Sequence, residues 1–356
     1  MRYLGMDVHG KATVYCLLDA KGDVADRGSV ATTAPALTEL VRRLSAEGPI
    51  VCGQEVGTMS HFVHDLMTEA GVKVLSFNAQ HLRMIAASRK KTDRRDAYWI
   101  AKCLQTGMMP HPVHIPTAEV RRLRSLLTQR QALATERKRW LLRARSHLRA
   151  CGVIVAPGSG KITRRLEEAM SRRDGLEAHR AEAIELCARQ ERNLRDELRR
   201  LERTLYQEAR RIDAVHRLRT IPAVGIWVAL TIYAAVGDIA RFPRARLLTA
   251  YAGLVPAVHQ SGESTRVGAI TKAGSPMLRS VLVQAGHVLL FRCLAPEAQP
   301  LRRLVERVHT ARARRKIAIV AGARVILRTA FYILRDGTEY QPERLRSGAK
   351  EENKAA

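Results

Sequence analysis

This 356-residue chain is poor in paired cysteines, long apolar runs and acidic residues. Its six cysteines lie far apart and form no C-x-x-C pair. That spacing excludes a disulfide framework and a cysteine zinc site, and indicates reduced thiols in an intracellular protein. No apolar run approaches ~18 residues, and the first residues already read as a strand, so neither membrane insertion nor secretion is indicated. We therefore expect a cytoplasmic protein.

The shortage of acids leaves a formal net charge of +27, from 61 Lys/Arg against 34 Asp/Glu. Such an excess predicts strong, salt-sensitive binding to DNA or RNA, mostly through phosphates. The excess is uneven: residues 1–115 have 14 basic against 11 acidic residues, 116–215 have 24 against 14, and 216–356 have 23 against 9. An arginine-rich proteome would spread the bias more evenly, so a nucleic-acid partner is favoured.

Residues 1–115 have the pattern of an α/β domain. Strands are expected over residues 2–7, 12–18, 23–31, 49–55 and 73–77, with helices over 36–46, 59–70 and about 93–105. Three meander strands followed by alternating helix and strand is the order of a ribonuclease-H-like domain. In that order the ends of the first and fourth strands are neighbours, and a late helix lies across them.

Four carboxylates occupy informative places in this domain. Asp7 closes the first strand and Glu55 the fourth, while Asp93 and Asp96 are three apart on a helix and share one face. Taken singly, each acid could be an ordinary surface residue. Together they predict a site for Mg²⁺ (or Mn²⁺), which takes carboxylate, water and phosphate oxygens as ligands. His9 lies beside them in the sequence, and the pattern assigns it no role.

Residues 116–215 are expected to form a basic coiled-coil arm. A basic helix over 118–150, a loop over 152–161 and a second helix over 176–212 are predicted, and the second helix has an apolar seam with 3/4 spacing. Such an arm could dimerise the protein, lie along a nucleic acid, or be a solvated structural hairpin. The residues expected to contact nucleic acid are Arg121, Arg122, Arg137, Lys138, Arg139 and Arg143.

Residues 216–340 read as a mainly α-helical domain. Residues 218–225 and the apolar helix after them have the pattern of a helix-hairpin-helix, which presents backbone N–H groups at Gly225 to a phosphate. The hairpin usually has glycine where this chain has Ala223, which predicts some alteration of the turn. A glycine- and hydroxyl-rich stretch follows over 253–274. Arg266, Lys272 and Arg279 are candidate clamps on a phosphate, and residues 341–356 are expected to be disordered.

These features together resemble the DEDD transposases of bacterial insertion sequences, the group that includes the pilin-gene invertase and the bridge-RNA-guided serine recombinases. The matching stretches are Gly5-Met-Asp7-Val-His, Glu55 at its strand end, Lys91-Thr-Asp-x-x-Asp-Ala97, Ile221-Pro-Ala-Val-Gly, Ala250-Tyr-Ala-Gly-Leu-Val-Pro, Gln260-Ser-Gly262 and Gly268-Ala-Ile-Thr-Lys-x-Gly274. The resemblance covers residues 2 to about 335, with both halves in the expected order.

The resemblance implies a fold, a chemistry and partners. It implies a RuvC-like, DEDD metal-binding catalytic domain over 1–115 that binds Mg²⁺ through the four acids, and a C-terminal transposase domain that supplies a serine nucleophile. By position that serine is Ser261, although Ser264 follows closely and leaves the choice between the two hydroxyls open. The family further implies an active site shared between subunits of a tetramer, and a structured noncoding bridge RNA that pairs with donor and target DNA.

We therefore expect a DNA transposase that acts as a site-specific recombinase through Mg²⁺-assisted attack of serine on the scissile phosphate. Two alternatives remain open. A metal-dependent nuclease or Holliday-junction resolvase would use the same acids with water as nucleophile, giving free 5′-phosphate ends and no covalent adduct. A non-catalytic DNA- or RNA-binding module would bind equally well without Asp7 or Asp96, and would cleave under no metal.

Overall fold

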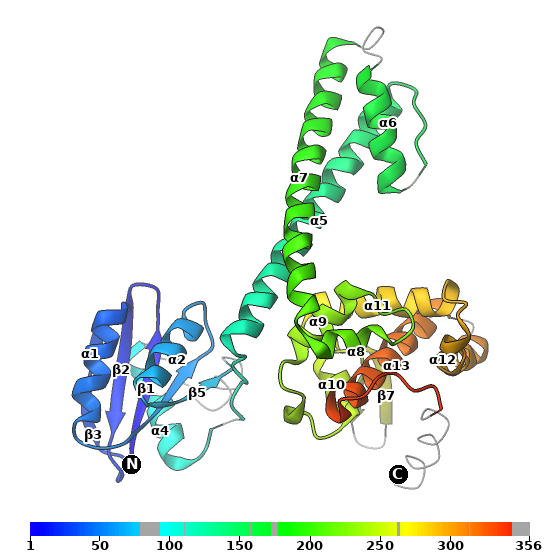
Figure 1. The fold of residues 1–356 in the computed structure, drawn as a ribbon. Helices are drawn as coiled ribbons and strands as arrows, with labels where there is room; N and C mark the ends of the chain where they lie inside the picture. Colours follow the sequence, from blue (N-terminus) through cyan, green and yellow to red (C-terminus); the bar gives the residue numbers. More distant parts are fainter. Residues whose placement is uncertain are drawn as a thin grey trace. The chain divides into compact units, whose positions relative to one another are not determined.

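A five-stranded sheet organises the first of two units, Met1–Ile115 and Pro116–Ala356, into which the chain divides (Figure 1). The computed structural model describes residues 1–78, 93–109, 111–156, 158–171, 177–261, 264–312 and 314–343. The expected mixed α/β region followed by a mostly helical region is confirmed. The disorder expected over 341–356 falls largely outside the described residues, which end at 343.

The sheet combines antiparallel and parallel pairing. Its strand order is β3-β2-β1-β4-β5, with β1–β2 and β2–β3 antiparallel and β1–β4 and β4–β5 parallel. The strands are β1 (Arg2–Val8), β2 (Ala12–Leu18), β3 (Val24–Ala31), β4 (Ile50–Glu55) and β5 (Lys73–Phe77). The prediction that the first and fourth strands are neighbours is therefore confirmed.

Helices cover both faces of this sheet. On one face α1 (Ala34–Ser45) and α2 (Ser60–Glu69) enclose a core that includes Leu4 and Met6 of β1. On the other face α4 (Asp93–Thr106) packs Ala97 and Ala101 against β2. Because side chains alternate along a strand, odd-numbered residues of β1 face α4 and even-numbered ones face α1 and α2.

Two long helices begin the second unit. They are α5 (Ala118–Ala150) and α7 (Ala178–Arg210), and they pack along each other. A third helix, α6 (Ser159–Ser171), packs against both around a small core with Ile162, Leu166 and Ile184 (Figure 1). Helix α6 was not predicted from the sequence, because Gly158, Ser159 and Gly160 suggest a loop and only the residues after them show helical spacing.

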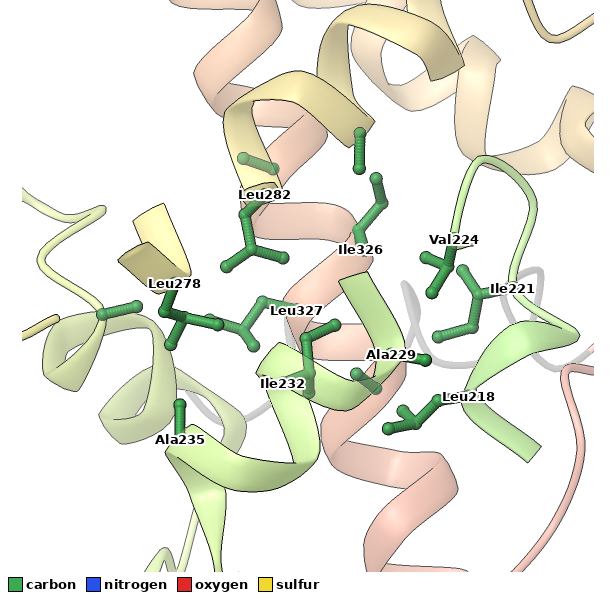
Figure 2. Packing of buried hydrophobic residues seen from close by; sticks show 14 of the residues in the cluster. Leu218, Ile221, Val224, Ala229, Ile232, Ala235, Leu278, Leu282, Ile326 and Leu327 are labelled. Atoms are coloured by element: carbon green, nitrogen blue, oxygen red, sulfur yellow. The ribbon is translucent and has the colours of Figure 1, made fainter. Parts of the chain in front are cut away.

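The remaining chain folds around one apolar helix. Helix α9 (Ile226–Val236) is apolar on all sides. Other helices surround it, because a helix without a polar face must be buried. Figure 2 shows Ile232 of α9 among Leu218, Leu278 and Leu327, which come from three other helices. The other elements are α8 (Asp213–Arg219), α10 (Ala245–Tyr251), β6 (Pro256–Ser261), β7 (Ser264–Ile270), α11 (Pro276–Phe291), α12 (Gln299–Arg312), α13 (Arg315–Asp336) and the 3₁₀ turns η1 (Ile239–Arg241) and η2 (Pro296–Ala298).

An antiparallel strand pair, β6–β7, lies where the sequence suggested only a glycine- and hydroxyl-rich stretch. The pair is short and exposes Val258 and Val267, so its pattern shows no buried face from which strands could be recognised.

Helix α13 is long and apolar enough to pass a test for a membrane span on length and composition alone, and so is the bent pair formed by α11 and α12. Half of the apolar window of α13 is buried inside the protein, where Ile326, Leu327 and Phe331 join the core around α9. Arg324 and Arg328 interrupt its apolar sequence. Packing of this kind is that of a core helix.

Candidate functional site

Asp7 and Glu55 lie at the carboxyl ends of two neighbouring parallel strands. The register pairs Met6 of β1 with Gln54 of β4, so the next residue on each strand is one of the two acids. Both acids follow by two positions a glycine, Gly5 or Gly53, that faces α4. By alternation, Asp7 and Glu55 therefore extend from the same face of the sheet, the one that α4 covers.

The two glycines let α4 approach the sheet closely. A Cβ atom on Gly5 would lie 2.0 Å from the Ala97 carbonyl oxygen and 2.5 Å from the Ala101 nitrogen. A Cβ on Gly53 would lie 2.7 Å from a methyl of Leu104. The absence of these two side chains brings the start of α4 to the strand ends.

Asp93 and Asp96 occupy the first turn of α4. Carboxylates at a helix N-terminus are stabilised by the unpaired N–H groups and the helix dipole. From this turn both negative charges act on Asp7. Of the four predicted acids, Asp7 and Asp93 lie in one cluster. Asp96 acts on Asp7 through its charge, and strand register places Glu55 beside Asp7. Lys91 and Thr92 of that motif lie outside the described residues.

His9 joins this group. Its Nε2 atom lies 3.1 Å from Oδ2 of Asp7 and 3.6 Å from Oδ2 of Asp93. One ligand atom from each of these three residues lies within 4.8 Å of the other two. No role for His9 was predicted from the sequence. Its place two residues after Asp7, on the turn between β1 and β2, was the signal that could have indicated one.

The electrostatics of Asp7 fit a cation site. Burial is the largest effect on its carboxyl group and raises the pKa. The neighbouring imidazole of His9 lowers the pKa, whereas the charges of Asp93 and Asp96 raise it. Several carboxylates held this close repel one another, and a divalent cation bound among oxygen ligands would relieve that repulsion.

The two candidate serines belong to the β6–β7 pair. Ser261 is the last residue of β6 and pairs in register with Ser264, the first residue of β7. The side chains of both lie outside the described residues. The base of the pair is well fixed, since Thr271 N donates to Val255 O at 2.9 Å and Lys272 N to Gly253 O at 3.2 Å.

The predicted nucleic-acid residues of the arm have different surroundings. Arg137 donates through Nε and Nη2 to Glu191, at 2.9 and 2.7 Å, and Glu191 is almost fully buried. Arg122 pairs with Glu208 at 2.6 Å. Arg139 pairs with Glu136, Arg143 stacks over Trp140 with 4.5 Å to the ring centroid, Arg121 is half-buried, and Lys138 is exposed.

In the C-terminal region, Arg279 directs its Nη1 atom at backbone carbonyls, 2.8 Å from Ala273 O and 3.3 Å from Ala252 O. Arg266 and Lys272 are exposed, and Lys272 has a left-handed backbone with φ of 56°. Left-handed backbone at a non-glycine residue is strained, and such strain is found most often at functional sites.

Helix α8, the turn at 220–225 and helix α9 follow one another where the helix-hairpin-helix is expected. Gly225 is exposed at the N-cap of α9, with open space around it. Ala223 adopts φ of 67°, in the region that glycine enters freely. The chain therefore makes a glycine-type turn with an alanine.

Comparison of the sequence with known proteins identifies the family of this chain. A family model described as a transposase, of the DEDD type of IS110 elements, matches residues 4–152, and the model "Transposase IS116/IS110/IS902 family" matches residues 215–302. The chain belongs to the IS110/IS116 family of insertion-sequence transposases.

Relatives of this transposase match it over most of both chains. The transposase for insertion sequence element IS1111A of Coxiella burnetii is 28% identical over 82% of this chain and 78% of its own. A probable family 20 transposase of Pseudomonas aeruginosa is 27% identical over 71% and 75%. The pilin gene-inverting protein of Moraxella bovis is 25% identical over 75% and 74%.

Membership makes this transposase an enzyme that cuts and rejoins DNA, with DNA as its substrate. The DEDD family type also indicates use of a divalent metal. The acids at the β1 and β4 ends and at the start of α4 are the part of the described chain whose chemistry fits that ion.

Proposed function

We propose that this protein transposes a bacterial insertion sequence by serine attack on DNA, assisted by Mg²⁺ (or Mn²⁺) at Asp7, Glu55, Asp93 and Asp96. The proposed first domain is RuvC/ribonuclease-H-like. The observation that carries the proposal is the convergence of strand-end and helix-start acids on one face of the sheet. Such a fold commonly places a metal centre for phosphodiester chemistry at that position.

In the proposed reaction, one bond to phosphorus forms as another breaks. The hydroxyl oxygen of Ser261 forms a bond to the scissile phosphorus while the bond from phosphorus to one deoxyribose oxygen breaks. The serine proton leaves, and the departing sugar oxygen gains a proton. When bound, the cation supplies charge stabilisation at the reacting phosphate. The phosphoserine linkage keeps the energy of the broken bond, so another strand end can displace the serine without ATP.

The proposed partners follow from charge and family. Donor and target DNA would bind through the basic second unit, where Lys138, Arg266 and Lys272 are exposed. A structured bridge RNA from the element would pair with both DNAs. The acids of one subunit and Ser261 of another would form each active site in a dimer or tetramer, with the arm contributing to assembly or to nucleic-acid binding.

A covalent-adduct assay tests the proposal. The full chain would be co-expressed with the DNA that flanks its gene, and protein–DNA species that survive denaturation would be compared among wild type, Ser261→Ala and the matched variant Ser264→Ala. We expect an adduct in wild type and Ser264→Ala that is absent from Ser261→Ala. Loss in Ser264→Ala alone would transfer the attack to Ser264.

Other outcomes of this assay correspond to the other functions. Mg²⁺-dependent breaks with free 5′-phosphates, no adduct and no effect of Ser261→Ala would identify a nuclease or Holliday-junction resolvase. DNA binding that neither Asp7→Ala nor Asp96→Ala changes, with no cleavage under any divalent metal, would identify a binding module.

A further inference from the structure

His9 has the contacts of a ligand at the acidic centre. Its Nε2 atom lies 3.1 Å from Asp7 Oδ2 and 3.6 Å from Asp93 Oδ2, with all three ligand atoms mutually within 4.8 Å. Metal–ligand bonds to oxygen and nitrogen are about 2.0–2.2 Å long, so two ligands on opposite sides of an ion are about 4 Å apart. The group therefore has the size that a single small cation requires.

The backbone of His9 is held by buried residues. Its N–H donates to Ala12 O at 3.2 Å, and its carbonyl accepts from the Thr32 hydroxyl at 2.7 Å. Thr32 is buried, and its hydroxyl oxygen lies 2.9 Å from that of Thr13, which is fully buried. Thr32, the residue after β3, thus fixes the backbone of the β1–β2 turn at His9.

The simpler explanation of these contacts is an exposed ion pair between imidazole and carboxylate. Such pairs stabilise a fold by at most about 1 kcal/mol and need no fixed backbone. Here the side chain of His9 is 54% exposed while its backbone is anchored by a buried hydroxyl. Its nitrogen meets acids from both β1 and α4, at the centre where the DEDD acids gather. The position of the His9 side chain and the anchoring of its backbone both favour a role as a metal ligand.

A nitrogen ligand changes which ion the site prefers. Mg²⁺ takes oxygen ligands and keeps several waters. Mn²⁺ also favours oxygen ligands, but as a transition metal it accepts an imidazole nitrogen more readily than Mg²⁺ does. We infer that His9 supplies a nitrogen ligand to the divalent-cation site and biases this site towards Mn²⁺ relative to Mg²⁺. The inference rests on the proposed function, because it assumes that the DEDD acids bind a metal.

Electron paramagnetic resonance of Mn²⁺ bound to the full chain tests this inference directly. Spin-echo modulation by ¹⁴N reports an imidazole nitrogen bonded to Mn²⁺, independently of cleavage activity. We expect ¹⁴N modulation in wild type and its loss in His9→Ala. His64→Ala is the matched control: His64 also lies beside a carboxylate, with Nδ1 3.4 Å from Asp65 Oδ1, but on the other face of the sheet.

Affinity provides the second measurement. In His9→Ala the dissociation constant for Mn²⁺ should rise about tenfold, and that for Mg²⁺, measured by competition, less than about threefold. His9→Asp, which offers oxygen instead of nitrogen, should bind both ions and lose the preference for Mn²⁺. A ¹⁴N signal that persists in His9→Ala, or equal losses for the two ions, would overturn the inference.

A variant of a DEDD acid separates failure of the inference from failure of the proposed function. Asp7→Asn should remove most Mn²⁺ binding if the acids form the metal centre. If Asp7→Asn weakens binding but His9→Ala leaves the ¹⁴N signal and ion preference unchanged, only the assignment of His9 is wrong. If Asp7→Asn binds Mn²⁺ as wild type does, the metal centre of the proposed function fails, and the inference fails with it.

Discussion

The two units of this transposase use charged residues in opposite ways. Residues 1–115 have a net charge of only +3, yet the charges of Asp93 and Asp96 both act on Asp7. Residues 116–356 have 47 basic against 23 acidic residues, a net charge of +24. Much of that basicity is used inside the protein, as when Arg124 donates to the carbonyls of Ala234 and Ala235 at the end of α9. Net charge therefore measures the attraction of a region for nucleic acid, and says little about which arginines contact it.

The same contrast holds for how each region positions its functional residues. In the first unit, strand register and two glycines bring the acids together. In the second, arginines hold other parts of the fold in place. Arg279 binds the carbonyls at the base of the β6–β7 pair, and Arg130 stacks over the Trp227 ring, 4.4 Å from its centroid.

Removing a converging acid should have the largest effect. Asp96→Ala or Asp93→Ala should lower the rate of strand cleavage by about a thousandfold or more, because charge stabilisation at the phosphate is lost. The measurement is cleavage of flanking DNA at saturating Mg²⁺. Glu69→Ala, an exposed acid at the end of α2, is the control and should cleave as wild type does. Intact cleavage in Asp93→Ala and Asp96→Ala would remove the metal centre from the mechanism.

The close approach of α4 can be broken without touching an acid. Gly5→Ala places a methyl 2.0 Å from the Ala97 carbonyl oxygen. Overpacking against backbone should destabilise the first unit by about 3 kcal/mol and displace the start of α4, with loss of cleavage. Gly10→Ala is the matched control, since nothing lies within 4 Å of its added Cβ. Thermal unfolding measures the stability of the two variants, and metal binding reports the position of the start of α4. Equal stability of Gly5→Ala and Gly10→Ala would contradict the close contact between Gly5 and α4.

In the arm, neighbouring basic residues should behave differently. Arg137→Ala leaves the buried Glu191 with weaker partners, Thr163 at 3.3 Å and Arg195 at 3.7 Å. It should destabilise the arm by about 2–3 kcal/mol, as loss of one partner of a buried pair does. Lys138→Ala should leave stability unchanged and reduce the salt dependence of nucleic-acid binding. Hydrogen exchange in α5 and α7 measures the loss of stability in each variant. If Lys138→Ala destabilised the arm and Arg137→Ala only weakened nucleic-acid binding, Arg137 would be the phosphate contact.

The smallest effect concerns the hairpin turn. Ala223→Gly should stabilise the protein by about 1 kcal/mol, because the left-handed backbone at this position costs an alanine that much. Thermal unfolding of the full chain measures the change, and DNA binding should be unaltered. Gly225→Ala should destabilise by about 0.5–1 kcal/mol, because alanine is disfavoured at an N-cap, and by no more, since Gly225 has φ of −81° and open space around it. Destabilisation by Ala223→Gly would mean that the methyl group contributes packing larger than the strain.

The elements and contacts that could be predicted from the sequence were those that leave a local pattern in it. The strands of the sheet, the pairing of β1 with β4 and the convergence of Asp7 with the acids of α4 followed from strand patterns and helical spacing. Helix α6 and the β6–β7 pair were missed, because glycines hide the start of the helix and exposed valines hide the faces of the strands. The predicted phosphate contacts at Arg122, Arg137 and Arg279 could not be checked from sequence, since an arginine paired with protein looks the same as a free one.

The sequence by itself determined the class of chemistry, since residue types at strand ends and along a helix are local and periodic. It also determined the family, through motifs in both halves of the chain. Only the tertiary structure decided that His9 lies between Asp7 and Asp93, and that many arginines serve the fold. Both depend on contacts between segments far apart in the chain, and such contacts leave no regular pattern in the residues that make them.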